Sequence, residues 1–230
     1  MRPSPFRTAM FTARNRWLHR AAALVVSALV VAVAWPAAAQ PLYDDLVFAV
    51  TNDRAEQARG LLARGLDPDS VDPNGDPMLV IAARAGNAAT VDVLLAGRAK
   101  VNARNRYGDT AIMVAALNGH LGIVRMLRTK GAALDYPGWT PLIYAATGGH
   151  DEIVRFLLAE GANVDAGSPN GTTALMMAVR EGRVSTVELL LARGANANLR
   201  NENGVGALDW AKRNDDKAMV EKLRRAGARG

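Results

Sequence analysis

The segment that decides the fold covers residues 138–165 and reads GWTPLIYAATGGHDEIVRFLLAEGANVD. Thr140 stands before an apolar run that starts with Pro141, and this order is typical of an N-cap followed by the first helical residue. Gly149 interrupts the run, and Gly161 follows a second one. Because glycine readily adopts the left-handed conformation that closes a helix, the segment predicts two short helices joined by a tight turn.

The same pattern recurs along residues 42–230, where three sets of positions keep one common spacing. The turn glycines stand 33, 30, 33 and 33 residues apart, and the other two sets show the same shortened step. The turn set is Gly75, Gly108, Gly138, Gly171 and Gly204, the set that ends the second helix is Gly65, Arg98, Gly131, Gly161, Gly194 and Gly227, and the set between the helices is Gly86, Gly119, Gly149, Gly182 and Asp215. Three sets in one register indicate a structural period.

The residues between these positions have the sizes that stacked helix pairs need. Ala145-Ala146 keeps the first helix thin, so that neighbouring pairs can approach closely. Val154 and Leu157 form an i, i+3 apolar stripe on the second helix. The predicted N-caps of the first helices are Thr110, Thr140 and Thr173. The pattern therefore predicts two layers of helices with turns projecting from one edge.

This pattern resembles the ankyrin repeat, whose signature is Thr-Pro-Leu-His in a period of about 33 residues. The resemblance implies an all-α fold, namely a solenoid of stacked helix-turn-helix units with about six repeats and a degenerate N-terminal cap. The expected repeats are residues 42–71, 72–104, 105–134, 135–167, 168–200 and 201–230. Each terminal repeat has one neighbour, so we expect polar outer faces at both ends.

The chain departs from the family pattern in three ways. The signature histidine is replaced, so packing or water must substitute for its hydrogen bonds. Its replacements are Val80, Met113, Ile143, Met176 and Asp209. Arg98 stands where a helix-closing glycine is expected, which leaves Gly97 to take the left-handed conformation or that helix to end differently. The 30-residue step shortens one turn between Ala132 and Gly138.

Residues 1–39 have the features of a secretory signal peptide. They contain five arginines and no acidic residue, and they continue into an uncharged apolar stretch, residues 21–35, and then small residues. We expect cleavage after Ala39, with Met1 or Met10 as the start. A retained membrane anchor is the alternative, although about 20 apolar residues are needed to span a bilayer.

Removing this leader changes the charge balance. The chain has 28 basic residues, and loss of the leader's five leaves 23 against 22 acidic ones. The net charge of +6 therefore gives no reason to expect a nucleic-acid partner, and after leader removal we expect no membrane partner. The chain has no cysteine, which excludes disulfides and a lipoprotein anchor. We expect a monomer in the bacterial periplasm, exported by the general secretory route.

Residues able to catalyse a reaction are not apparent. No nucleophile, base and orienting group share a recognisable pattern, so we predict a protein that is not an enzyme and carries no cofactor. His120 and His150 occupy equivalent turn positions, where we expect bonds to the backbone. A carrier or sensor of metal or haem is the alternative function, with these histidines and the methionines as its only candidate ligands.

The resemblance also implies where binding occurs. Ankyrin domains bind proteins through turn tips and the concave face of the first helices. The matching positions are Arg104, Arg106, Tyr107, Asp109, Tyr136, Trp139, Tyr144, Arg180, Glu181 and Arg200. Four of these are aromatic and flank the shortened turn, although only 5% of the chain is aromatic.

We predict that another protein binds there and that the chain serves as a scaffold, for example as an accessory factor to an exported enzyme. The competing interpretation is that Trp139 and Tyr144 only fill the gap left by the missing residues.

Overall fold

The computed structural model describes residues 39–135 and 138–229. Tyr136 and the predicted leader, apart from its last residue, lie outside the described residues. Within them, no helix combines the length and apolar composition required to cross a membrane.

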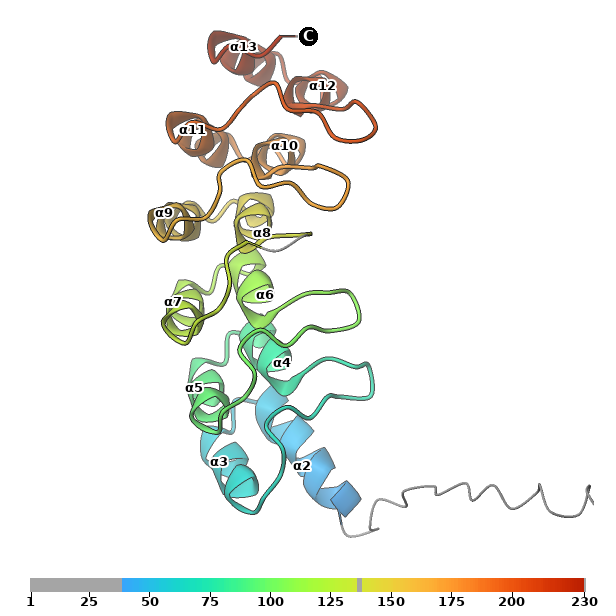
Figure 1. The fold of residues 1–230 in the computed structure, drawn as a ribbon, viewed down its shortest axis with the longest axis vertical. Helices are drawn as coiled ribbons and strands as arrows, with labels where there is room; N and C mark the ends of the chain where they lie inside the picture. The colour runs from blue at the N-terminus through green and yellow to red at the C-terminus, as the bar shows by residue number, and fades with distance from the viewer. Residues whose placement is uncertain (1–38, 136–137, 230) are drawn as a thin grey trace, which may run out of the picture. The chain divides into compact units, whose positions relative to one another are not determined.

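Twelve helices occur in the described part of the chain, and they form six consecutive pairs. The pairs are α2 (Ala39–Thr51) with α3 (Ala55–Ala63), α4 (Met78–Ala85) with α5 (Ala88–Ala96), α6 (Ala111–Leu117) with α7 (Leu121–Thr129), α8 (Pro141–Gly148) with α9 (Asp151–Ala159), α10 (Ala174–Arg180) with α11 (Val184–Ala192), and α12 (Ala207–Arg213) with α13 (Lys217–Arg225). In Figure 1 the first helices stack in one row and the second helices in another. The predicted all-α solenoid of six repeats is confirmed.

The turns before the first helices project from one edge as narrow hairpins (Figure 1). Four of them are closed by an isolated antiparallel bridge, and the bridged pairs are Val71 with Pro77, Arg104 with Thr110, Gly167 with Thr173, and Arg200 with Gly206. The turn before α8 has no such bridge among its described residues, and the repeat step there is three residues shorter in the sequence. The shortened step falls in the connection between α7 and α8, which is called the short hairpin below.

A side-chain oxygen near the start of each long hairpin fixes its conformation. Asn105 Oδ1 accepts hydrogen bonds from the backbone N–H groups of Tyr107 and Asp109, both at 2.9 Å. Asp72 does the same for Asn74 and Asp76, at 2.9 and 2.8 Å. These bonds satisfy turn amides that have no other backbone partner, so the hairpin tips are held rigidly.

A ladder of polar side chains joins each repeat to the next, and the sequence analysis did not identify it. Asn102 Oδ1 accepts a hydrogen bond from Ala133 N–H at 3.0 Å, and Asp165 Oδ1 accepts one from Asn196 N–H at 2.9 Å. The other acceptors are Asp69, Asp135 and Asn198. These acceptors stand 33, 33, 30 and 33 residues apart, which is the spacing of the repeats, and each of them bonds its repeat to the following one.

The core combines small and large apolar residues on the first helices with branched apolar residues on the second. Ala145 and Ala146 are fully buried, as are Val154 and Leu157, which confirms the predicted stripe. Four replacements of the signature histidine, Val80, Met113, Ile143 and Met176, are also buried, so packing substitutes for its hydrogen bonds.

Asp209 is the polar replacement of that histidine. Its carboxylate accepts hydrogen bonds from Gly206 N–H at 2.9 Å and from Arg200 at 2.8 Å. The Gly206 amide, followed by the charge of Arg200, outweighs the effect of burial and holds the pKa of Asp209 below its usual range. Asp209 therefore keeps a polar link between hairpin and helix in the last repeat.

The predicted N-caps differ among repeats. Thr140 Oγ1 accepts from Ile143 N–H at 3.3 Å and Thr173 Oγ1 accepts from Met176 N–H at 3.4 Å, which confirms two of them. Thr110 also occupies the N-cap position of α6 with an extended backbone, but its buried hydroxyl has no hydrogen-bond partner among the described residues.

The end of α5 corrects another expectation. Arg98 itself adopts the left-handed conformation with φ of +67°, whereas Gly97 has an ordinary φ of −72°. A Cβ on Gly97 would lie 3.0 Å from Leu62 Cδ1, so close packing accounts for the glycine. Arg98 is exposed, and its chain position tolerates a side chain at the cost of some backbone strain.

The interhelix turns bond each repeat to the preceding first helix. His120 Nε2 lies 3.3 Å from Arg84 O, and His150 Nε2 lies 2.8 Å from Leu117 O. The predicted backbone bonds of both histidines are confirmed. Each ring packs so tightly that a Cβ on the glycine of the preceding turn, Gly86 or Gly119, would come within 2.7 Å of it.

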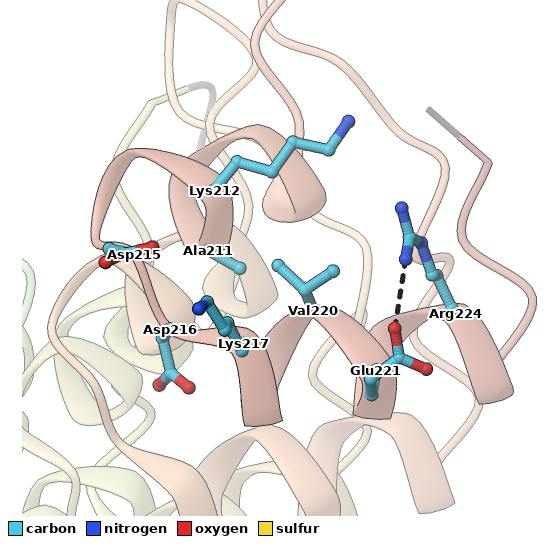
Figure 2. Close-up of a pocket in the computed structure, with 8 residues that line it drawn as sticks. All are labelled: Ala211, Lys212, Asp215, Asp216, Lys217, Val220, Glu221 and Arg224. Atoms are coloured by element: carbon cyan, nitrogen blue, oxygen red, sulfur yellow. Dashed lines mark hydrogen bonds and ion pairs between the residues drawn. The ribbon is translucent and has the colours of Figure 1, made fainter.

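The C-terminal repeat has a polar outer face. Lys212, Lys217 and Arg224 are exposed around a cleft of about 480 Å³, in which Val220 occupies the centre (Figure 2). Arg224 pairs with Glu221 at 3.0 Å. The first repeat likewise exposes Asp53, Arg54, Glu56, Gln57 and Arg59. Both terminal repeats thus expose mainly polar side chains, as expected, together with Phe48 in the first repeat.

Candidate protein-binding face

A pocket of about 180 Å³ opens at the short hairpin. Tyr107 and Gly108 border it from the preceding hairpin, Trp139 lies beside it at the start of α8, and Pro169 belongs to the following hairpin. Tyr107 is 69% exposed and Trp139 is 38% exposed. The pocket thus lies between two long hairpins, beside the shortened connection, with exposed aromatic rings at its edge.

Tyr144 contacts Trp139, which borders this pocket. Its ring meets Trp139 edge to face, with 5.8 Å between ring centroids and an angle of 76°. Its hydroxyl donates a hydrogen bond to Asp109 Oδ1 of the preceding hairpin. Tyr144 is about half buried, and this burial, followed by the bond to the Asp109 carboxylate, raises its pKa above the usual value. Tyr144 and Asp109 therefore position Trp139 and the hairpin rather than face solvent freely.

The bond between Tyr144 and Asp109 makes the free energy of unfolding depend on pH in the alkaline range. A raised pKa in the folded state means that the contribution is complete below the ordinary tyrosine pKa of about 10 and is lost as pH rises further. We expect Tyr144→Phe to lower the free energy of unfolding at pH 7 by about 1.5 kcal/mol, since a hydrogen bond to a charged acceptor is removed. Urea unfolding from pH 8 to 11 checks this result. The variant should lose less stability across that range than the wild type, and equal losses in both proteins would contradict the assignment.

The predicted cationic residues fall into two groups. Arg104 borders the pocket, and Arg106 stacks on Tyr107 with its Cζ 4.8 Å from the ring centroid. The remaining predicted site residues, Arg180, Glu181 and Arg200, lie in the last two repeats. The structure therefore brings six of the ten predicted residues together at the short hairpin and places three elsewhere, while Tyr136 is not described.

Sequence reasoning missed several residues at this face. Met113 and Pro169 line the pocket, and Trp210 lies on α12 between Arg180 and Arg213. The 33-residue period offered a signal for Trp210, because it stands one period after Met177, which itself stands one period after Tyr144. The period identifies the face formed by the first helices, called the inner face below, but it does not indicate which of its side chains are exposed.

The histidines proposed for a metal or haem carrier are already engaged. Each Nε2 atom faces a backbone carbonyl, as described above, and a metal ion would have to displace that contact. Across residues 39–135 and 138–229, no group of three or more histidine or acidic side chains could hold a metal ion.

Stacked helix pairs with projecting hairpins define a helical repeat protein, a class in which neighbouring repeats build one extended binding surface. The comparison with family models then identifies the repeat. The model described as ankyrin repeats (3 copies) matches residues 46–137, 130–201 and 162–229, so the chain belongs to the ankyrin-repeat family. The family fold is an interaction module, typically for other proteins.

Several curated proteins are similar over part of this chain. Human mitochondrial disaggregase is 48% identical over 59 residues, which are 26% of this chain and 8% of that protein. The pig NF-kappa-B inhibitor alpha is 36% identical over 93 residues, or 38% of this chain and 30% of the inhibitor. The zebrafish ankyrin repeat domain-containing protein 29 is 46% identical over 55 residues, or 24% of this chain and 18% of the relative. The matches span less than a third of each relative.

Proposed function

We propose that the protein is an exported scaffold that binds a partner protein in the bacterial periplasm. The observation that carries this proposal is the pocket between Tyr107 and Trp139, where two aromatic rings stay exposed above a rigid framework. Aromatic and arginine side chains dominate binding energy at protein interfaces, because they bury large areas at modest entropic cost. The pocket supplies both types.

The surroundings of the pocket favour a preformed site. Asn105 holds the Tyr107 hairpin through two backbone bonds, and Tyr144 joins that hairpin to α8 through Asp109. A rigid site binds more tightly because less conformational entropy is lost on association. The pocket beside the short hairpin has room for one large apolar side chain of a partner, with the rings of Tyr107 and Trp139 on its sides.

The sequence supplies the support for export and for a protein partner. The basic and then apolar start of the chain supports export, and the near-neutral balance of residues 40–230 supports a protein partner over nucleic acid. The matched NF-kappa-B inhibitor alpha is named for an effect on another protein, which is consistent with a regulatory or accessory role here. We propose that the scaffold acts as a monomer and serves as an accessory factor to an exported enzyme.

Capture from a periplasmic extract tests this function. The full chain is expressed with a C-terminal tag in its bacterial host, recovered from the periplasm, and the proteins that co-purify are identified. We expect one dominant protein that is retained by the wild type and lost with Tyr107→Ala/Trp139→Ala. Recovery of the tagged chain from the cytoplasm only, or equal capture by both chains, would contradict the proposal.

A further inference from the structure

The inner face carries a second aromatic site in its last two repeats. Trp210 is partly buried on α12, and two guanidinium groups lie over its indole ring. Arg180 Cζ is 5.3 Å from the ring centroid and Arg213 Cζ is 5.0 Å from it. Cations over an indole face are attracted by the ring quadrupole, which holds both side chains in place.

The 33-residue period shows what these two arginines lack. Arg84 occupies the same repeat position in α4, and its Nη1 bonds Asp76 Oδ2 at 2.7 Å, eight residues earlier. The residues eight positions before Arg180 and Arg213 are Thr172 and Val205, so the matching carboxylate is absent. The chain thus keeps the arginine but removes its internal partner in the last two repeats.

The remaining contacts leave most of this positive charge uncompensated. Arg180 Nε lies 3.4 Å from Glu181 Oε1, and the Arg180 side chain is 49% exposed, so this pair is weak. Arg213 is exposed and has no ion pair among the described residues. A stacked guanidinium keeps its N–H edge available, and that edge matches the two oxygens of a carboxylate.

Trp210 is also a poor choice for packing alone. Its Nε1 is buried and has no hydrogen-bond partner among the described residues, which disfavours an indole relative to a fully apolar side chain. The same repeat position holds Ile81, Val114 and Met177 elsewhere, and Tyr144, whose hydroxyl is bonded to Asp109, so none of them has this disadvantage. The indole is explained if its face is needed to hold the two arginines.

We infer that Arg180, Trp210 and Arg213 form a carboxylate-binding site for an acidic segment of the partner protein. This inference rests on the proposed function, because it assigns a chemical class to the partner that the scaffold binds. In the complex, Asp or Glu side chains replace the carboxylate that Asp76 supplies to Arg84 within the chain. The apolar pocket at Trp139 and this cationic site would then contact different parts of one partner.

A fluorescently labelled decaglutamate peptide tests the inference, with decaglutamine as the uncharged control. Binding to the purified full-length protein is measured by anisotropy at low salt. We expect Arg213→Gln to weaken decaglutamate binding at least fivefold, since the uncompensated guanidinium is lost. Arg225→Gln removes the same charge from an exposed position on α13 and should leave binding within twofold.

A second variant keeps both arginines. Val205→Asp supplies a carboxylate at the position equivalent to Asp76, and it should reduce decaglutamate binding at least fivefold by compensating Arg213 internally. Unchanged binding in Arg213→Gln or Val205→Asp, or an equal loss in Arg225→Gln, would overturn the inference. If these results fail while partner capture still requires Tyr107 and Trp139, only the acidic character of the partner is wrong. If partner capture fails as well, the proposed function is wrong.

Discussion

Replacing Gly119 with alanine is expected to lower the free energy of unfolding by about 3 kcal/mol, combining backbone strain with a steric clash. Gly119 has φ of +81°, a conformation that alanine adopts only with strain. An added Cβ would also lie 2.7 Å from the His150 ring, which is fixed by its bond to Leu117 O. Urea unfolding of the purified protein measures the change.

Gly182→Ala is the matched control for this prediction. Gly182 occupies the same repeat position with φ of +65°, but a Cβ there would have no neighbour within 4 Å. It should cost about 1 kcal/mol, the backbone contribution alone. Combining Gly119→Ala with His150→Ala should lose less stability than the sum of the single changes, since the clash is removed. Equal losses for Gly119→Ala and Gly182→Ala would show that the histidine contact contributes nothing.

The second large effect concerns binding. Tyr107→Ala/Trp139→Ala should weaken the affinity for the captured partner at least 100-fold, or about 3 kcal/mol, because two exposed rings at one pocket act as interface anchors. Their exposure of 69% and 38% means that stability should change little. Calorimetric titration gives the affinity, and thermal unfolding gives the stability.

Phe48→Ala provides the comparison. Phe48 is a 55% exposed aromatic residue on α2, in the first repeat and not among the residues that line the pocket. Its replacement should leave partner affinity within about twofold, as is usual for residues outside a hot spot. A double variant that loses melting temperature and affinity in parallel would instead indicate that Tyr107 and Trp139 maintain the fold.

The sequence was sufficient for the repeat because each repeating residue has a local physical reason. Gly149 and Gly161 follow from backbone conformation, and Ala145 follows from the close approach of neighbouring helices. Local reasoning failed at Arg98, where the packing of Leu62 against Gly97 left the left-handed conformation to the arginine. Such contacts join residues that are distant in sequence, so no period reveals them.

The candidate site was predicted less completely, for the same reason. The shortened spacing located the pocket, but it did not show that Tyr144 is tied to Asp109 while Trp139 stays exposed. Side chains at equivalent positions differ in exposure because their neighbours in adjacent repeats differ. The polar ladder through Asn102 and Asp165 also follows the period, and it could have been found by comparing polar positions as well as glycines.

Backbone hydrogen exchange of the full chain, with and without the captured partner, tests the central claim most directly. A protein bound at the short hairpin should slow exchange in residues 104–110 and 138–144, and it should leave the second helices α7 and α9 unchanged. Slowed exchange confined to α7 and α9, with the two hairpin segments unaffected, would place the partner on the opposite face and contradict the account.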